Sequence, residues 1–241
     1  MKLRNGGALW GKWPNWLVGY ALLTGVAVTA YAEEVIPDTI GQRVKACVAC
    51  HGDQGRASNS GYYPRIAGKP EGYLYNQLLN FRDGRRNYPA MVYMVTGLTD
   101  DYLREIAHFF AQQHPPYPAP QTPASAQEMT LGAALVNKGD AARGLPACAA
   151  CHGPALAGVE PGIPSLLGLP RDYLFAQLNN WKNGERKAAT PDCMHGIVGK
   201  LSAADMTAVA AWLSSQPVAN ENRPAAQPAS PLPLRCGSMP Q

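Results

Sequence analysis

The chain has 241 residues, enough for two modest domains, with 21 Lys and Arg side chains against 17 Asp and Glu. Lys2, Arg4 and Lys12 precede the first acidic residue, so 18 of the 21 basic residues lie beyond position 32, where all 17 acidic residues also lie. This near-neutral balance excludes a nucleic-acid-binding protein, which needs a strongly basic surface.

The N-terminus has the pattern of an export signal. After the three basic residues, the stretch from Pro14 to Ala32 is uncharged, and it ends Ala30-Tyr31-Ala32 before Glu33. A basic start, a short apolar run and a small-residue end predict a signal peptide over residues 1–32, cleaved after Ala32. The alternative is an uncleaved membrane anchor over residues 13–32. Either places the folded part in the periplasm, soluble or held at the inner membrane.

One short motif occurs twice, as Cys47-Val-Ala-Cys50-His51 and as Cys148-Ala-Ala-Cys151-His152. The C-x-x-C-H spacing is typical of covalent c-type haem attachment, because two thiols one helical turn apart can each form a thioether and the next histidine can ligate iron. A zinc site would need further Cys or His pairs, and a redox dithiol would need a strand-rich context. The sequence therefore predicts two covalently attached haem c groups.

The residues around each motif also repeat. Residues 71–82 and 171–182 share Tyr, Leu and Gln at an offset of 100, with apolar positions at helical spacing, and each predicted helix stops at a glycine. Earlier helices are expected over Thr39–Cys47, capped by Asp38, and over Glu128–Lys138. The last helix of each repeat starts after Thr99 or Ser202 and runs to about Gln112 or Ser215.

The fold class that follows is all-α, with two tandem haem domains. The predicted boundaries are 33–113 for the first domain, 114–127 for a proline-rich linker, 128–216 for the second domain and 217–241 for a proline-rich tail, extended or disordered.

Each haem iron needs a sixth ligand, and methionine is the common choice in cytochromes c. Met91 lies seven residues before Leu98, and Met194 lies seven before Leu201, so the repeat selects Met91 over Met94. The alternative is that these methionines fill the core. His195 is the other residue close enough to compete as a ligand.

Other residues near the motifs are candidates for supporting roles. Pro64 and Pro164 follow the haem histidines by 13 and 12 residues, and their carbonyls are candidate acceptors for the second ring N–H of each histidine. Basic residues after the repeated helices could pair with haem propionates, face a partner, or form a solvated loop. They are Arg82, Arg85, Arg86, Lys182, Arg186 and Lys187.

Cys193 and Cys236 remain outside the motifs. In an oxidising compartment we expect a disulfide that pins the tail beside the second haem pocket, or free thiols. The alternative makes Cys193 a thiolate ligand, which would change that haem's chemistry.

Together these features resemble the c4-type di-haem cytochromes over roughly residues 36–216. The resemblance rests on the two haem motifs, Pro64–Gly68 and Pro164–Gly168, the repeated Tyr-Leu and Gln-Leu helices, and Met91 and Met194. It implies two class I cytochrome c domains related by a pseudo-twofold, with the haem edges approaching at the interface. It also implies that Cys47, Cys50, His51 and Met91 serve one haem, and Cys148, Cys151, His152 and Met194 the other.

By the same resemblance, the expected function is single-electron transfer in the periplasm, from a bc1 complex or a dehydrogenase to a terminal oxidase, with no enzymatic activity. Two alternatives remain: a cytochrome subunit of a membrane-bound dehydrogenase or oxidase complex, and a di-haem sulfur-compound dehydrogenase. The tail, the Cys193/Cys236 pair and the short loop 153–162 depart from the family pattern.

Overall fold

The computed structural model describes residues 36–57, 62–219 and 221–239. By its contacts the chain divides into Met1–Ile36 and Pro37–Gln241, and every helix and strand described lies in the second part. The predicted leader, residues 1–32, lies outside the described residues. Within the described ranges, no helix has the length and apolar character needed to cross a membrane.

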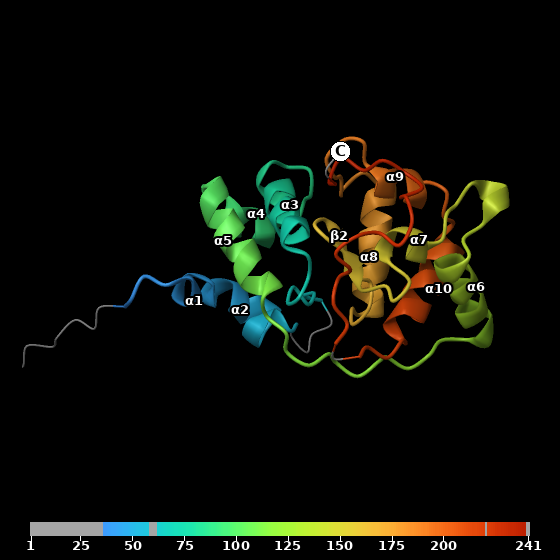
Figure 1. Cartoon of the computed structure of the whole chain (residues 1–241), viewed down its shortest axis with the longest axis horizontal. Helices are drawn as coiled ribbons and strands as arrows, with labels where there is room; N and C mark the ends of the chain where they lie inside the picture. Colours follow the sequence, from blue (N-terminus) through green and yellow to red (C-terminus); the bar gives the residue numbers. More distant parts are fainter. Residues whose placement is uncertain (1–35, 58–61, 220, 240–241) are drawn as a thin grey trace, which may run out of the picture. The chain divides into compact units, whose positions relative to one another are not determined.

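The first repeat comprises α1 to α5, drawn in blue to green in Figure 1. Helix α3 packs against α4 and α5 around a core that includes Phe81, Leu103 and Phe110. The bounds are α1 Ile40–Arg43, α2 Lys45–His51, the 3-10 turn η1 Asp53–Gly55, α3 Glu71–Arg82, α4 Pro89–Val95 and α5 Asp100–Ala111.

The second repeat comprises α6 to α10. Helix α10 packs against α6 and α8, and its many small and apolar side chains make it the most buried of the helices described. The bounds are α6 Ala126–Asn137, the 3-10 turn η2 Ala141–Arg143, α7 Cys148–His152, β1 Gly158–Val159, β2 Ile163–Pro164, α8 Arg171–Lys182, α9 Cys193–Val198 and α10 Ala203–Ser214.

The all-α fold class is confirmed, since the strands described are one antiparallel pair of two residues each. The repeated helices α3 and α8 have the predicted bounds, and α5 and α10 start after Thr99 and Ser202, whose side chains cap them. Serine caps α6 and α10 within full capping boxes, in which the third helical residue bonds back to the cap.

The predicted helix over Thr39–Cys47 is wrong in two respects. Thr39, not Asp38, caps it, and it is interrupted at Val44, so that α1 and α2 are separate. The Asp38 carboxylate instead accepts two hydrogen bonds from the Arg43 guanidinium, at 2.7 and 2.8 Å. The Asp38 side chain therefore pairs with Arg43, five residues along the chain, and does not cap the helix.

The two repeats are joined by the loops that follow α3 and α8. Arg86 and Arg186 form an antiparallel bridge, the Asn87 N–H donates to the Glu185 carbonyl (3.1 Å), and the Lys187 N–H donates to the Arg85 carbonyl (2.7 Å). Equivalent loops thus pair with each other, which is the contact expected of two domains related by a pseudo-twofold.

The linker between α5 and α6 has no regular structure, but it is held at several points. The Arg65 guanidinium donates to the carbonyls of Pro115 (2.6 Å) and Pro116 (3.1 Å) and stacks 4.1 Å from the centre of the Tyr117 ring. The domain boundaries proposed above are not tested by these contacts and stay predictions.

Within residues 221–239 the tail forms bends, turns and one bridge at Ala225, and it packs along the molecule. Ala225 exchanges backbone hydrogen bonds with Gly158 (3.0 Å) and Glu160 (2.8 Å) beside the small sheet. Farther on, Cys236 is disulfide-bonded to Cys193. The part of the tail that the structure describes is therefore tied to the second repeat at two places.

Candidate functional site

Short helices present both haem motifs. Cys47, Cys50 and His51 lie on α2, and the second motif forms the whole of α7. The i, i+3 spacing of the two cysteines places both thiols on one face of a helix, one turn apart. The four motif cysteines are free of disulfide bonds.

The two motif histidines are buried and share one hydrogen-bond arrangement. His51 and His152 are only 8% and 7% exposed. Their Nδ1 atoms lie 2.9 Å from the Pro64 carbonyl and 2.8 Å from the Pro164 carbonyl, as predicted. Because a carbonyl only accepts, Nδ1–H donates in both and the Nε2 lone pair is left available for a metal.

Burial also sets the ionisation of these groups. It lowers the pKa of both histidines below the ordinary value, so the neutral, ligand form of the ring is favoured. It raises the pKa of the Cys47 thiol and raises that of Cys148 to about 11. The nucleophile of a dithiol oxidoreductase has a lowered pKa, so Cys47 and Cys148 are unsuited to that role.

All eight predicted haem residues line one cavity of about 810 Å³, which extends through both repeats. The residues from the first repeat are Cys47, Cys50, His51 and Met91, and those from the second are Cys148, Cys151, His152 and Met194. The two methionines lie on α4 and α9, short helices that the sequence did not predict, and both pack against the apolar cores.

The two alternative ligands in the second repeat have other partners. Cys193 forms the disulfide with Cys236, so it has no thiolate to offer to iron. The His195 ring is exposed, and its Nδ1 lies 3.3 Å from the Trp181 carbonyl. Met194 is therefore the remaining candidate from α9.

A cluster between the repeats was not predicted. The Gln77 Oε1 accepts from Arg86 (3.0 Å) and Arg186 (3.1 Å), and the Gln177 Oε1 accepts from the same two guanidinium groups, at 2.7 and 2.9 Å. The hydroxyls of Tyr73 and Tyr173 each accept one further bond from this pair of arginines. The sequence did contain a signal for this cluster: a glutamine recurs at the same position of the two repeated helices, as Gln77 and Gln177.

The charges of this cluster matter for what the cavity can hold. Arg186 is 4% exposed, and its partners in the described residues are amides, tyrosine hydroxyls and the Trp181 ring, 3.8 Å away. Burial lowers its pKa, and the neighbouring Arg86 guanidinium lowers it further. Both Arg86 and Arg186 line the cavity, so a carboxylate within it would stabilise them. Three of the other basic candidates have partners elsewhere: Arg82 bonds Asp100 (2.7 Å), Arg85 bonds Asp83 (3.0 Å), and Lys182 bonds backbone carbonyls.

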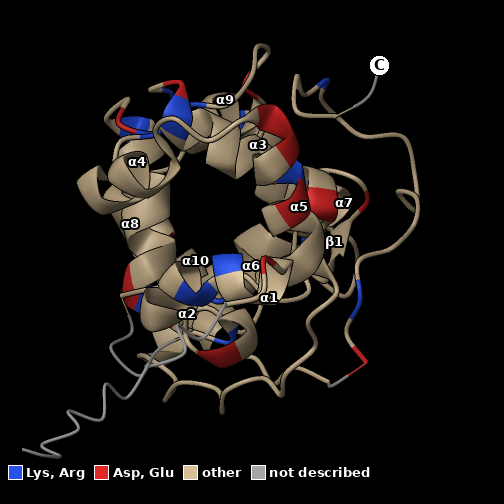
Figure 2. Cartoon of the chain, turned by 90° about the vertical axis from the view of Figure 1, so that its left-hand side faces the viewer, with Lys and Arg blue, Asp and Glu red and all other residues tan. Residues whose placement is uncertain are grey.

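A second buried cation joins the repeats. The Lys69 ammonium, 5% exposed, donates to the Ser165 hydroxyl (2.7 Å) and carbonyl (3.1 Å). Burial, with the nearby Arg65, lowers its pKa to about 7. Figure 2 shows positions of Lys and Arg and of Asp and Glu interspersed along the helices that face the viewer.

The residues present fit a covalently held haem. A buried neutral imidazole and a methionine sulfur would ligate the iron, the thiol pair suits vinyl attachment, and the arginines that line the cavity suit propionates. All of these side chains face one cavity.

Comparisons with known proteins agree with this arrangement. The cytochrome c family profile matches residues 129–217. The thiosulfate dehydrogenase electron acceptor of Thiomonas intermedia is 38% identical over 72% of this chain and 79% of its own length. Cytochrome c4 of Pseudomonas aeruginosa is 33% identical over 80% of this chain and 95% of its own length.

A solved structure extends the similarity to the fold. Reduced cytochrome c4 from Pseudomonas stutzeri superposes with a TM-score of 0.63 at 30% identity, over 72% of this chain and 95% of that one. These relatives are electron carriers rather than enzymes, and covalently bound haem c is the cofactor of the cytochrome c family. The chain therefore belongs to the c4-type di-haem cytochromes c.

Proposed function

We propose that this protein is a periplasmic carrier of single electrons with two haem c groups. Cys47 and Cys50 would hold the first by thioether bonds, and His51 and Met91 would ligate its iron. Cys148 and Cys151 would hold the second in the same way, and His152 and Met194 would ligate its iron. The observation that carries the proposal is the convergence of all eight side chains on one cavity shared by the two repeats.

Haem supplies reversible one-electron chemistry at its iron, and the protein sets the potential and the access of partners. The Pro64 and Pro164 carbonyls hold the tautomer and orientation of the two histidines. Methionine sulfur as sixth ligand raises the potential and leaves no open position for a substrate. The guanidinium groups of buried Arg186 and half-buried Arg86 are the proposed partners of propionates. This set of roles suits a carrier.

The ligand set is tested by the ferric spectrum and an optical redox titration of the holoprotein. The wild type should show the methionine–iron charge-transfer band for both haems and two positive potentials. Met91→Leu and Met194→Leu should each remove about half of the band and lower one potential only. Met94→Leu is the matched control, because Met94 lies on the same helix as Met91 and is exposed. A full band in either ligand variant would refute the assignment.

For the electron donor, we propose a dehydrogenase of the thiosulfate-oxidising type in preference to a bc1 complex. The support is the 38% identity to a protein named as the electron acceptor of thiosulfate dehydrogenase. The acceptor is proposed to be a terminal oxidase. Stopped-flow mixing of the oxidised protein with thiosulfate dehydrogenase and thiosulfate should reduce both haems, and omission of thiosulfate is the control. Reduction only by a bc1 complex and quinol would reverse the choice.

The alternative of a cytochrome subunit within a membrane-bound complex depends on residues 1–32, which lie outside the described residues. Mass determination of the protein purified from its host distinguishes the two. Loss of residues 1–32 supports a released periplasmic carrier, and their retention supports the anchored subunit.

A further inference from the structure

The helix that carries Met194 is too short to hold its own position. Helix α9, Cys193–Val198, has six residues, and isolated helices of this length are unstable in water. Its place beside the cavity therefore depends on what anchors it from outside. The position of the Met194 sulfur, which the proposed function makes an iron ligand, depends on the same anchors.

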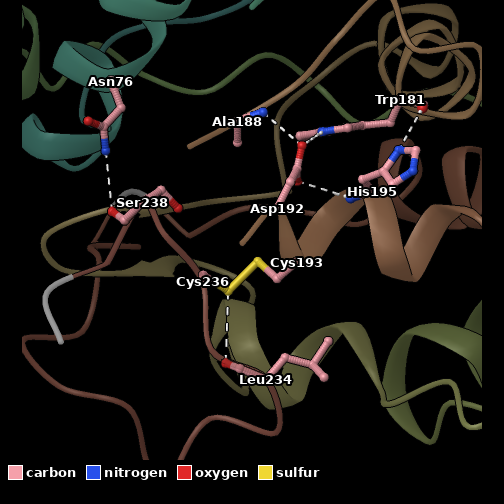
Figure 3. The surroundings of a disulfide bond; sticks show 9 residues. All are labelled: Asn76, Trp181, Ala188, Asp192, Cys193, His195, Leu234, Cys236 and Ser238. Atoms are coloured by element: carbon pink, nitrogen blue, oxygen red, sulfur yellow. Dashed lines mark hydrogen bonds between the residues drawn. A yellow bond between two sulfur atoms is a disulfide. The ribbon is translucent and has the colours of Figure 1, made fainter. Parts of the chain in front are cut away.

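Two anchors hold the first turn of α9 (Figure 3). The Asp192 carboxylate caps the helix at the His195 N–H (3.0 Å) and also accepts from the Ala188 N–H (2.7 Å) and the Trp181 indole N–H (3.3 Å). The second anchor is covalent: Cys193, the residue directly before Met194, is disulfide-bonded to Cys236 in the tail.

The tail segment around Cys236 is itself held by both repeats. The Gly237 N–H donates to the Pro191 carbonyl (2.9 Å) in the second repeat. The Asn76 side-chain amide, on α3 of the first repeat, donates to the Ser238 carbonyl (3.3 Å). A Cβ on Gly237 would lie 2.3 Å from the Thr190 carbonyl oxygen, so the tail passes very close to the loop before α9. Cys236 is 6% exposed. The cross-link thus joins α9 to a segment with fixed neighbours.

The equivalent helix in the first repeat has no such cross-link. When Met91 is aligned with Met194, the position of Cys193 is taken by Ala90. Helix α4 starts at a proline, has no side-chain cap, and exposes Tyr93 to 83% and Met94 to 39%. The two methionine-bearing helices are therefore anchored by different means.

We propose that Cys193 and Cys236 are positioning residues for Met194, and that their disulfide keeps the methionine sulfur of the second repeat at its haem iron. The first repeat has Ala90 at the equivalent position, so helix α4 has no such disulfide. This inference rests on the ligand set of the proposed function, and it predicts that loss of the cross-link affects one haem and spares the other.

The test uses the full-length holoprotein with both cysteines replaced, Cys193→Ser/Cys236→Ser, so that no stray thiol can bind iron. On warming, the ferric variant should lose about half of its charge-transfer band at a lower temperature than the wild type, while the other half keeps the wild-type profile. In a redox titration, one midpoint should fall and the other stay in place. Ala90→Ser is the matched control, since it places the same side chain at the equivalent position of α4, and it should leave both haems unchanged.

A purely structural cross-link would lower unfolding stability but leave the band and both potentials of the folded protein as in the wild type, and that result overturns the inference. If the charge-transfer band of the wild type is weaker than two methionine-ligated haems would give, the proposed ligand set is wrong, and the inference about the disulfide falls with it. If the variant does not accumulate, the disulfide of the purified wild type can be reduced with a phosphine and its two thiols alkylated. The haem iron is then reoxidised before the spectrum is recorded. Thioether attachment leaves only Cys193 and Cys236 to be alkylated, so mass spectrometry verifies the modification, and the same band and potentials are read.

Discussion

Lys69 gives the sharpest test of how the two repeats are joined. Its ammonium is buried, and within the described part of the chain its hydrogen bonds are to the neutral hydroxyl and carbonyl of Ser165. Its charged form is therefore penalised in the folded state. Burial lowers the pKa from 10.5 in the reference state to about 7. Between these two values the unfolded chain binds more protons than the folded one, and stability therefore rises as pH rises.

The magnitude follows from the size of the shift. With each pKa unit equal to about 1.4 kcal/mol, the charged ammonium destabilises the fold by about 4 kcal/mol at pH 7 and by about 1 kcal/mol at pH 9.5. In Lys69→Met this penalty is absent at every pH. Loss of the two bonds to Ser165 shifts the variant's curve by a constant amount and does not alter its slope.

The assay is guanidinium unfolding of wild type and Lys69→Met at intervals from pH 7 to 9.5. The free energy of unfolding of the wild type, relative to the variant, should rise by about 3 kcal/mol over this range. Lys45→Met, at an exposed position of α2, is the control for titration of a surface lysine and should run parallel to the wild type. Parallel curves for Lys69→Met as well would refute the burial of a charged amine between the repeats.

Three further changes have expected outcomes in the same unfolding assay. Leu103→Ala empties a fully buried position of α5 and should cost about 3 kcal/mol, whereas a cost below about 1 kcal/mol would contradict its place in the core. Ser202→Ala removes the cap of α10 and should cost about 1 kcal/mol, with Ser202→Thr as the conservative control. Cys236→Ser removes a disulfide between residues 43 positions apart, and the entropy of the unfolded chain predicts a loss of up to about 4 kcal/mol in the free energy of unfolding. If the wild type has the same unfolding midpoint with and without reductant, the stabilising bond is absent.

The local features could be predicted from the sequence because each depends on residues close together in the chain. The spacing of Cys47, Cys50 and His51 sets one face of a helical turn whatever surrounds it. The bounds of α3 and α8 follow from apolar periodicity and a terminating glycine. The repeat made each half a check on the other. Met91 was selected over Met94 because Met91 and Met194 both lie seven residues before a leucine, and the Pro64 and Pro164 carbonyls were found because both prolines follow a haem histidine by 12 or 13 residues.

The tertiary structure decided what depends on contacts between distant segments. Helices α4 and α9 are too short to be recognised by periodicity, and packing against neighbours rather than intrinsic propensity forms them. Propensity alone could not tell that Arg186 and Lys69 are buried, since isolated Arg and Lys residues are usually exposed. Arg186 lies in a loop that pairs with a loop 100 residues earlier, and Lys69 bonds Ser165, 96 residues along the chain. The sequence left Cys193 and Cys236 as a disulfide or as free thiols. The tertiary structure decided for the bond, because the tail returns across the second repeat and places its sulfur beside the helix that carries Met194.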